Sequence, residues 1–263
     1  MRRKIILHLH SSDFYVFFLT NNNKLKKYIN FIFSRVDKIV VLCTDWEIKL
    51  KQEYSFNHIV RIANPIDLKS EFQNDNAFRE DNGTFVLAFV GFLIESKGIR
   101  DLLETMKQLR NKGYSKIKLL IAGKGELESF ILDFIDKEKL SNTIDYVGWV
   151  AGESKDNLYK KSDVFILPSY KEGMPISILE AMTFGLPIIS TNISGVPDVI
   201  SVPRNGFLVS PGKVNEIVDA IMHCYENKDQ LITISENNLN DIKDFSAQNI
   251  FNQITKVYSD LLN

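Results

Sequence analysis

The sequence predicts an α/β protein in which residues 84–245 fold as a doubly wound parallel sheet. Apolar runs of strand length alternate with segments of helical periodicity along this stretch, and such alternation is typical of a parallel sheet covered by helices. The strand segments are almost continuously apolar, as strands buried on both faces are. An apolar fraction of 44% and a charged fraction of 25% agree with a globular protein.

The N-terminal residues 1–66 repeat this alternation on a smaller scale, and they predict a partial Rossmann-like domain. Residues 67–83 are polar and rich in turn formers, which makes them the best candidate for a linker. Thr44 is expected to cap the helix that follows it. We expect strands at 4–10, 38–43 and 58–63, and helices at 24–34 and 45–54.

The larger domain is predicted over residues 84–245, and a last helix follows at 246–263. That helix carries apolar residues at helical spacing. We expect strands at 84–91, 116–122, 144–147, 163–167 and 187–191, and helices at 97–112, from 126 onward, and at 156–161, 176–184, 214–227 and 230–242.

Cysteine content and hydropathy bound the location of the protein. Cys43 and Cys224 lie far apart and outside any metal-ligand spacing, so a reducing compartment is the default. No apolar run approaches the ~20 residues of a membrane span, and the run at 14–19 does not make a convincing signal peptide. The expected location is cytoplasmic, with contact at the inner face of the membrane as one option.

Basic residues are distributed unevenly along the chain. Residues 1–65 hold 11 Lys and Arg against 5 Asp and Glu, whereas the rest holds 21 against 28. A basic segment of this kind can face an anionic membrane surface or a phosphorylated acceptor. A solvated basic face is an equally good interpretation, and no nucleic acid partner is expected.

The stretch 168–205 is the richest in candidate functional residues. It holds two carboxylates, Glu172 and Glu180, and a short loop leads from the first into the helix predicted at 176–184. Pro175 suits the first helical position, since the N–H that proline lacks has no partner there. The N–H groups near this helix start, together with the helix dipole, favour a phosphate or diphosphate. Those groups belong to Met174, Ile176 and Ser177.

This stretch resembles glycosyltransferase family 4, the group 1 glycosyltransferases, which are retaining nucleotide-sugar-dependent enzymes with the GT-B fold. The family pattern is E-G-x-P-x-x-x-x-E-A-M-x-x-G-x-P, then G-x-P-E, then N-G-x-L-V. In this chain Asp198 replaces the last Glu of G-x-P-E. The matching residues are Glu172, Gly173, Pro175, Glu180, Ala181, Met182, Gly185, Pro187, Gly195, Pro197, Asn205, Gly206, Leu208 and Val209.

The resemblance implies roles for the two glutamates. Glu180 would accept hydrogen bonds from the ribose hydroxyls of the donor, and Glu172 would bind hydroxyls of the donor sugar near the reacting carbon. A carboxylate suits such recognition because its hydrogen bonds are charge-assisted. The loop and helix start between them would surround the donor through Gly173, Met174, Pro175 and Ile176.

The segment 91–98 resembles a second family pattern, G-R-L-x-x-x-K-G. Gly91 would let the diphosphate approach closely, and Lys97 would neutralise charge on the leaving group. Phe92 stands where the family has Arg, so one expected cation is missing. A solvated lysine at a helix start is the alternative interpretation of Lys97.

Weaker signals concern the base and the acceptor. Val150 follows a strand end where the family contacts the base. Gly123-Lys124-Gly125 indicates a tight turn rather than a dinucleotide fingerprint, because Glu128 replaces the third glycine. His10 matches the family's histidine near the reacting sugar, although His8 lies on the same face of the strand. A histidine that only hydrogen-bonds in a turn is the alternative for His10.

We therefore expect a retaining glycosyltransferase that moves a sugar, from a donor of the UDP type, to a glycan or lipid-linked acceptor in cell-surface polysaccharide biosynthesis. No Asp-x-Asp motif is present, and no metal is expected. Two alternatives stay open, a non-catalytic nucleotide-sugar-binding subunit or fragment of a split enzyme, and a nucleotide-sugar epimerase.

The family has a glycine-rich loop after its first strand, and this loop has no counterpart in the sequence. About a hundred residues of the family's N-terminal domain are missing together with it. This predicts truncation, with a partner chain or self-association through an uncovered apolar face near residues 5–9 and 40–42. In the family the last helix crosses back onto the N-terminal domain.

Overall fold

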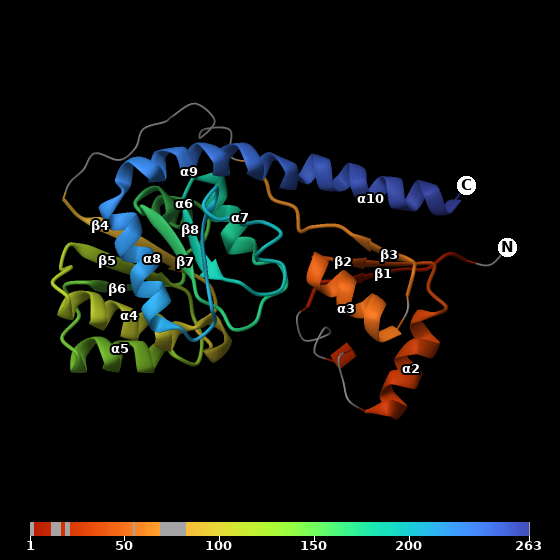
Figure 1. The fold of residues 1–263 in the computed structure, drawn as a ribbon, viewed down its shortest axis with the longest axis horizontal. Helices are drawn as coiled ribbons and strands as arrows, with labels where there is room; N and C mark the ends of the chain where they lie inside the picture. Colours follow the sequence, from red (N-terminus) through yellow and green to blue (C-terminus); the bar gives the residue numbers. More distant parts are fainter. Residues whose placement is uncertain (1–2, 12–16, 19–21, 55, 69–82, 263) are drawn as a thin grey trace.

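The computed structural model describes residues 3–11, 17–18, 22–54, 56–68 and 83–262. Two α/β units lie side by side, each built on its own parallel sheet, and the chain crosses between them twice (Figure 1). Most of the linker predicted at 67–83 lies outside the described residues. No described helix is long and apolar enough to cross a bilayer, and the cytoplasmic location stays a prediction.

The C-terminal unit contains a six-stranded sheet whose described strands all pair in parallel, in the order β6-β5-β4-β7-β8-β9. The strand order reverses between β4 and β7, and ligands bind at the carboxyl ends of strands at such a switch point. The strands are β4 (Phe85–Val90), β5 (Ile117–Ala122), β6 (Ile144–Gly148), β7 (Val164–Leu167), β8 (Ile188–Thr191) and β9 (Gly206–Val209).

Helices cover both faces of this sheet, and the core between the layers is apolar. Leu87, Phe89 and Phe165 are fully buried strand residues, as the continuous apolar runs predicted. The helices are α4 (Ile99–Asn111), α5 (Glu128–Lys137), α6 (Glu153–Lys160), α7 (Ile176–Thr183), α8 (Val214–Glu226) and α9 (Lys228–Asp241), with 3-10 turns η2 (Glu95–Lys97) and η3 (Ile242–Phe245).

The N-terminal unit contains three parallel strands in the order β1-β2-β3. Alternation along β2 sends Ile39 and Val41 into the core with α2 and α3, and Val40 to the other face against Ile250 of the last helix. The elements are β1 (Ile6–Leu9), α2 (Asn23–Phe33), β2 (Lys38–Val41), α3 (Thr44–Tyr54), β3 (Ile59–Arg61) and α10 (Ala247–Leu262).

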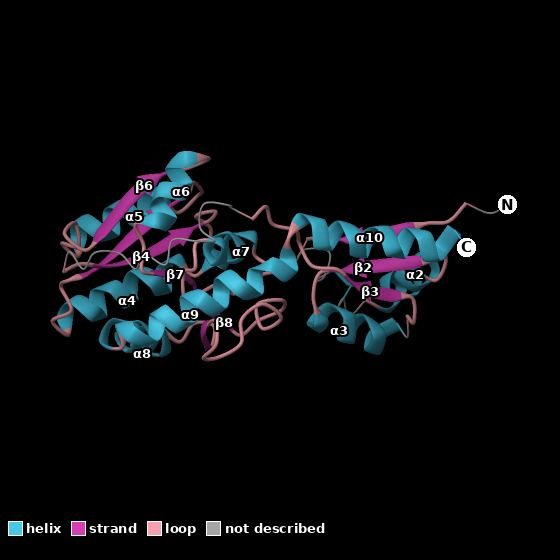
Figure 2. Ribbon diagram, turned by 90° about the horizontal axis from the view of Figure 1, so that it is seen from above, coloured by secondary structure: helices cyan, strands magenta, loops and turns pink. Residues whose placement is uncertain are grey.

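Helix α10 crosses from the C-terminal unit and lies along the N-terminal sheet, as Figure 2 shows. Its Ile250, Ile254 and Val257 pack against Val40 and Ile62, so the crossover expected from the family resemblance is present. The prediction of an uncovered apolar face near residues 40–42 is wrong, because Val40 is buried under α10. Among the described strands β1 still has one unpaired edge, and self-association stays a prediction.

The two chain crossings lie against each other. Ile66 forms a β-bridge with Ser246; its N–H donates to Phe245 O at 2.9 Å, and its carbonyl accepts from Ala247 N at 3.0 Å. The two connecting segments are therefore joined to each other by hydrogen bonds at this point.

Four local expectations need correction. Strand β9 was not predicted: it is only four residues long and opens with Gly206, whose positive φ of 148° and closeness to Ile188 O exclude a side chain. The helix expected from residue 97 begins at Ile99, after the turn η2 and left-handed Gly98. Thr44 is the first residue of α3 rather than its cap, and Pro175 is the N-cap of α7 rather than its first residue.

Candidate active site between the two units

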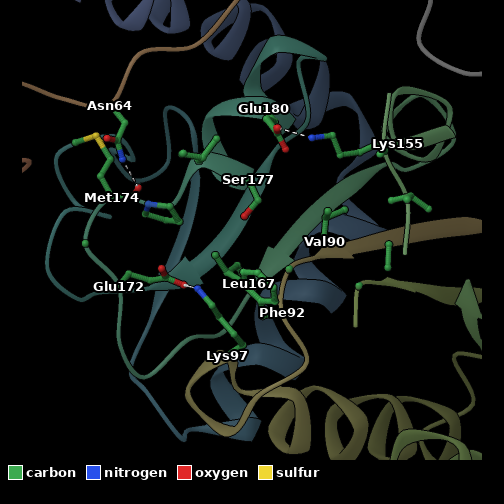
Figure 3. A pocket seen from close by; sticks show the side chains of 18 of the residues that line it. Asn64, Val90, Phe92, Lys97, Lys155, Leu167, Glu172, Met174, Ser177 and Glu180 are labelled. Atoms are coloured by element: carbon green, nitrogen blue, oxygen red, sulfur yellow. Dashed lines mark hydrogen bonds and ion pairs between the residues drawn. The ribbon is translucent and has the colours of Figure 1, made fainter. Parts of the chain in front are cut away.

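A pocket of about 770 Å³ lies at the carboxyl ends of β4 and β7 and at the start of α7, and it is closed on one side by the N-terminal unit (Figure 3). Every site residue predicted from the sequence lines it, although these residues come from both units. Their roles stay predictions. They are His10, Gly91, Phe92, Lys97, Val150, Glu172, Gly173, Met174, Pro175, Ile176 and Glu180.

At one end of the pocket Glu172 forms a buried ion pair with Lys97. The Glu172 side chain is 7% exposed, and its Oε1 accepts from Lys97 Nζ at 2.7 Å and from Ser169 Oγ at 2.7 Å. Its Oε2 has no protein partner among the described residues, so that oxygen is available to a ligand. Lys97 is 19% exposed, and the interpretation of Lys97 as a solvated lysine is therefore wrong.

Backbone packing fixes the position of Lys97. Gly98, the next residue, has a positive φ of 71°, and a Cβ there would meet Pro168 O at 2.0 Å. Only glycine lets the turn that carries Lys97 press against the loop that carries Glu172. Close packing alone therefore explains why glycine follows lysine in this motif, and no ligand is needed for the explanation.

At the other end of the pocket Glu180 is held by two donors. Its Oε1 accepts from Lys155 Nζ at 2.5 Å and its Oε2 from Tyr159 OH at 3.0 Å. Tyr159 is fully buried; burial first, and the charge of Glu180 second, raise its pKa well above the usual value. The Tyr159 hydroxyl therefore stays protonated and donates.

Lys155 was not predicted as a site residue. It lies on α6 (Glu153–Lys160), and its side chain is 27% exposed against 22% for Glu180. Nothing in the local sequence joins Lys155 to a glutamate 25 residues away. The contact arises only because α6 and α7 bring the two side chains to the same rim of the pocket (Figure 3).

The start of α7 lies between the two glutamates, and Ser177 in its first turn faces the pocket (Figure 3). Pro175 has extended backbone angles, φ −72° and ψ 118°, and ends the loop. The N–H groups of Met174, Ile176 and Ser177 have no acceptor among the described residues. Unpaired N–H groups at the positive end of a helix dipole attract an anion.

The outer wall of the pocket is aromatic. Phe92 and Trp149 are both more than half exposed, and their ring centroids are 6.4 Å apart. Lys124 lies outside the pocket lining, with Nζ 5.0 Å from the centroid of the Trp149 ring. The tight packing predicted at this segment is present, because a Cβ at Gly123 would meet Gly91 O at 1.9 Å.

The N-terminal unit contributes His10 through a contact that also reaches the other unit. The Asn64 amide donates from Nδ2 to Met174 O at 3.0 Å, and its Oδ1 lies 3.4 Å from His10 Nδ1. Because an amide oxygen only accepts, a hydrogen bond here requires neutral His10 to carry its proton on Nδ1, which leaves Nε2 as an acceptor. This contact of Asn64 was not predicted from the sequence.

His8 lies beside His10, as strand alternation predicted. Their rings are parallel with centroids 5.9 Å apart, but only His10 lines the pocket. Burial, and then the neighbouring His10, lower the pKa of His8. The structure thus distinguishes the two candidates, which the sequence did not.

The motif glycines and Asp198 hold the two units in register. A Cβ at Gly195 would meet Gly173 O at 2.4 Å and Cys43 Cβ at 2.9 Å. Asp198 accepts from Thr44 N at 2.6 Å and lies 3.7 Å from Arg61. The carboxylate therefore stabilises the start of α3 from across the interface.

Metal ligands do not gather in the described part of the chain, where no group of three or more His, Cys, Asp or Glu side chains could hold an ion. The charged side chains of the pocket are paired lysines and glutamates. What the pocket offers to an anionic ligand is two ammonium groups, in Lys97 and Lys155, and the N–H groups at the start of α7.

Two parallel α/β units that face each other across a pocket define the GT-B class of fold. The chain matches a Staphylococcus aureus TarM variant in complex with fondaparinux, α-GlcNAc-glycerol and UDP, with a TM-score of 0.81 and 18% identity over 97% of this chain and 50% of TarM. Anabaena HepE in complex with UDP matches with a TM-score of 0.82 and 20% identity over 98% of this chain and 73% of HepE. The predicted GT-B fold is confirmed.

The chain belongs to the family of group 1 glycosyl transferases, whose sequence profile matches residues 70–241. The capsular polysaccharide biosynthesis glycosyltransferase CapM of Staphylococcus aureus is 29% identical over 199 residues, which cover 73% of this chain and 52% of CapM. The chain thus spans about half the length of CapM and of TarM. The predicted membership of the group 1 glycosyltransferases is confirmed.

Proposed function

We propose that the chain is a retaining, metal-independent glycosyltransferase of the family 4 type that uses a UDP-sugar. The observation that carries the proposal is the arrangement in one pocket of Glu172 paired with Lys97, Glu180 paired with Lys155, and the open N–H groups of α7 between them. This set matches the three parts of such a donor, its sugar, its ribose and the diphosphate that joins them.

The diphosphate would lie at the start of α7. Helix N–H groups and Lys97 would hold its oxygens and stabilise the charge that develops when the sugar leaves. We propose that Lys155 supplies the second cation, which Phe92 cannot provide. Glu180 would then exchange the ammonium of Lys155 for the ribose hydroxyls, while Tyr159 continues to hold its other oxygen.

Transfer would take place beside Glu172. The bond between the anomeric carbon and the phosphate oxygen breaks, the acceptor oxygen bonds to the same face of that carbon, and the acceptor proton passes to the leaving phosphate. Oε2 of Glu172 would bind a sugar hydroxyl, and Nε2 of His10 would accept a hydrogen bond from the sugar or the acceptor. The N-terminal unit would exclude water from this reaction.

The relatives support a role in polysaccharide synthesis. CapM is named for capsular polysaccharide biosynthesis, and another relative is an Escherichia coli O-antigen chain mannosyltransferase. TarM and HepE are both seen with UDP. We therefore propose a glycan or lipid-linked acceptor and a uridine nucleotide as the product.

The test is turnover of radiolabelled UDP-sugars with glycan and lipid-linked acceptors, with and without EDTA. The proposal expects label in the acceptor, unchanged by EDTA, and an anomeric configuration by NMR that equals that of the donor. A Glu172→Gln variant is the control for contaminating activity. Tight UDP binding without transfer would instead identify a non-catalytic binding subunit, and label that stays in an altered nucleotide sugar would identify an epimerase.

A further inference from the structure

Helix α2 presents an exposed face on which two lysines lie next to three large apolar side chains. Tyr28, Phe31 and Ile32 are 62%, 56% and 42% exposed, and Lys24 and Lys27 are exposed beside them. At 3.6 residues per turn these five positions fall on one side of the helix, opposite buried Ile29 and Phe33. We call these five residues the α2 face.

The charge of the α2 face has one sign. The helix contains no Asp or Glu, and Lys24 and Lys27 have no ion-pair partner among the described residues. Lys26, which lies outside the α2 face, pairs with Glu53 of α3 at 2.5 Å. No described acidic residue therefore neutralises Lys24 or Lys27.

Three described acids of the N-terminal unit pair with lysines outside the α2 face, so they leave the charge of the α2 face unchanged. Asp37 pairs with Lys4, and Asp45 and Glu47 pair with lysines one turn further along α3. Arg35 also lies beside the α2 face, with its guanidinium carbon 3.5 Å from the centroid of the Phe31 ring.

We propose that the α2 face is a peripheral membrane-binding surface that lies on an anionic lipid bilayer. Exposed aromatic and aliphatic side chains can insert at the headgroup boundary, and lysines beside them attract anionic headgroups. A free polyanion would use the lysines but leave the apolar side chains in water, and the two exposed surfaces together on one helix match the layered chemistry of an anionic bilayer. The combination of the two on one helix favours a bilayer.

This proposal concerns a surface separate from the pocket and does not depend on catalysis. None of the residues of the α2 face lines the pocket, so bilayer binding can be measured without a donor or acceptor. If both proposals hold, the surface would bring a lipid-linked acceptor to the N-terminal unit.

The test is sedimentation of the full chain with vesicles of phosphatidylcholine alone or of phosphatidylcholine mixed with phosphatidylglycerol. The proposal expects binding to the mixed vesicles only, which weakens as salt is raised. Lys24→Glu with Lys27→Glu should lower the partition coefficient by roughly tenfold or more, and Tyr28→Ser with Phe31→Ser should also lower it severalfold.

Two matched controls separate this surface from general stickiness. Lys112→Glu with Lys116→Glu makes the same charge change on exposed lysines of the C-terminal unit. Phe251→Ser with Tyr258→Ser removes two exposed aromatic side chains from α10, which lies on the other face of the N-terminal sheet. Both variants should bind as the parent does, and thermal unfolding should show that all four variants are folded.

Three outcomes would overturn the proposal. They are no binding to mixed vesicles, equal loss in the control variants, and loss with the lysine pair while the aromatic pair binds as the parent does. The last outcome would indicate a site for soluble polyanions, since insertion of side chains would then contribute nothing.

Discussion

The two lysine–glutamate pairs at the ends of the pocket consist of the same residue types but differ in their surroundings. Lys97–Glu172 is deep, with side chains 19% and 7% exposed, whereas Lys155–Glu180 is 27% and 22% exposed. Glu172 leaves one oxygen without a protein partner, while both oxygens of Glu180 already have donors.

This difference indicates different duties. The deep pair must stay together, because an uncompensated charge in a buried place is costly. The outer pair can separate at a smaller cost than the deep pair, because both of its side chains are more exposed. We therefore interpret the deep pair as a fixed part of the site and the outer pair as one that opens when a nucleotide arrives.

The largest effect is expected from breaking the deep pair. Lys97→Met should abolish measurable UDP binding and lower the free energy of unfolding by about 3 kcal/mol, the low end of the cost for a broken buried pair. The measurements are calorimetric titration with UDP and urea denaturation.

The double variant Lys97→Met with Glu172→Gln is its control. Removing both charges should restore most of the stability without restoring UDP binding, because the lost cation is still absent. A single variant as stable as the parent would show that the deep pair is not a fixed part of the fold.

A smaller effect is expected from the outer pair. Lys155→Met should change the free energy of unfolding by no more than about 1 kcal/mol. It should weaken UDP binding about tenfold, as loss of one charged hydrogen bond does, but leave uridine binding equal or tighter, because Glu180 is released. Titration with UDP and with uridine distinguishes these effects.

The Phe92→Arg variant complements Lys155→Met, because it adds a positive charge near the diphosphate whereas Lys155→Met removes one. It should tighten UDP binding, and more so in the Lys155→Met background, where the second cation is missing. Equal loss of UDP and uridine affinity in Lys155→Met would contradict a contact with the diphosphate and leave Lys155 as a support for Glu180 alone.

The smallest effect concerns the hydroxyl that holds Glu180. The native pKa of Tyr159 is raised, so the folded state keeps a proton that the unfolded state loses above about pH 10. This tyrosine therefore favours folding below that pH, and its contribution falls as the pH rises through 10.

Urea denaturation of the parent and Tyr159→Phe should show a difference of about 1 kcal/mol near neutral pH, which shrinks in alkaline solution. The other tyrosines are the same in both proteins, so the difference isolates Tyr159. A constant difference between pH 8 and pH 11 would contradict the raised pKa.

Much of the C-terminal unit could be predicted because its signals are local. Continuous apolar runs marked β4, β5 and β7, and short motifs marked Lys97, Glu172 and Glu180. Strand β9 escaped because it is four residues long and opens with a glycine that also suits a turn. Its pairing with β8 depends on a close approach that no local pattern reports.

Contacts between distant segments could not be predicted in the same way. Lys155 reaches Glu180 only through the packing of α6 on α7, and Asn64 reaches Met174 only when the two units meet. The sequence analysis predicted an uncovered face on the N-terminal sheet, although α10 covers it. Only the family resemblance indicated where α10 lies, and no local pattern in the sequence did. Long-range geometry decides all three.

The contact of Asn64 links the approach of the two units to the tautomer of His10. The Asn64 side chain contacts Met174, in the loop before α7, through its amide nitrogen and His10 through its amide oxygen. If the units separate, the nitrogen loses Met174 O and the amide is free to turn over, which would present its NH2 group to His10. Neutral His10 would then carry its proton on Nε2 instead of Nδ1, so we expect Nε2 of His10 to accept a hydrogen bond only while the two units are together.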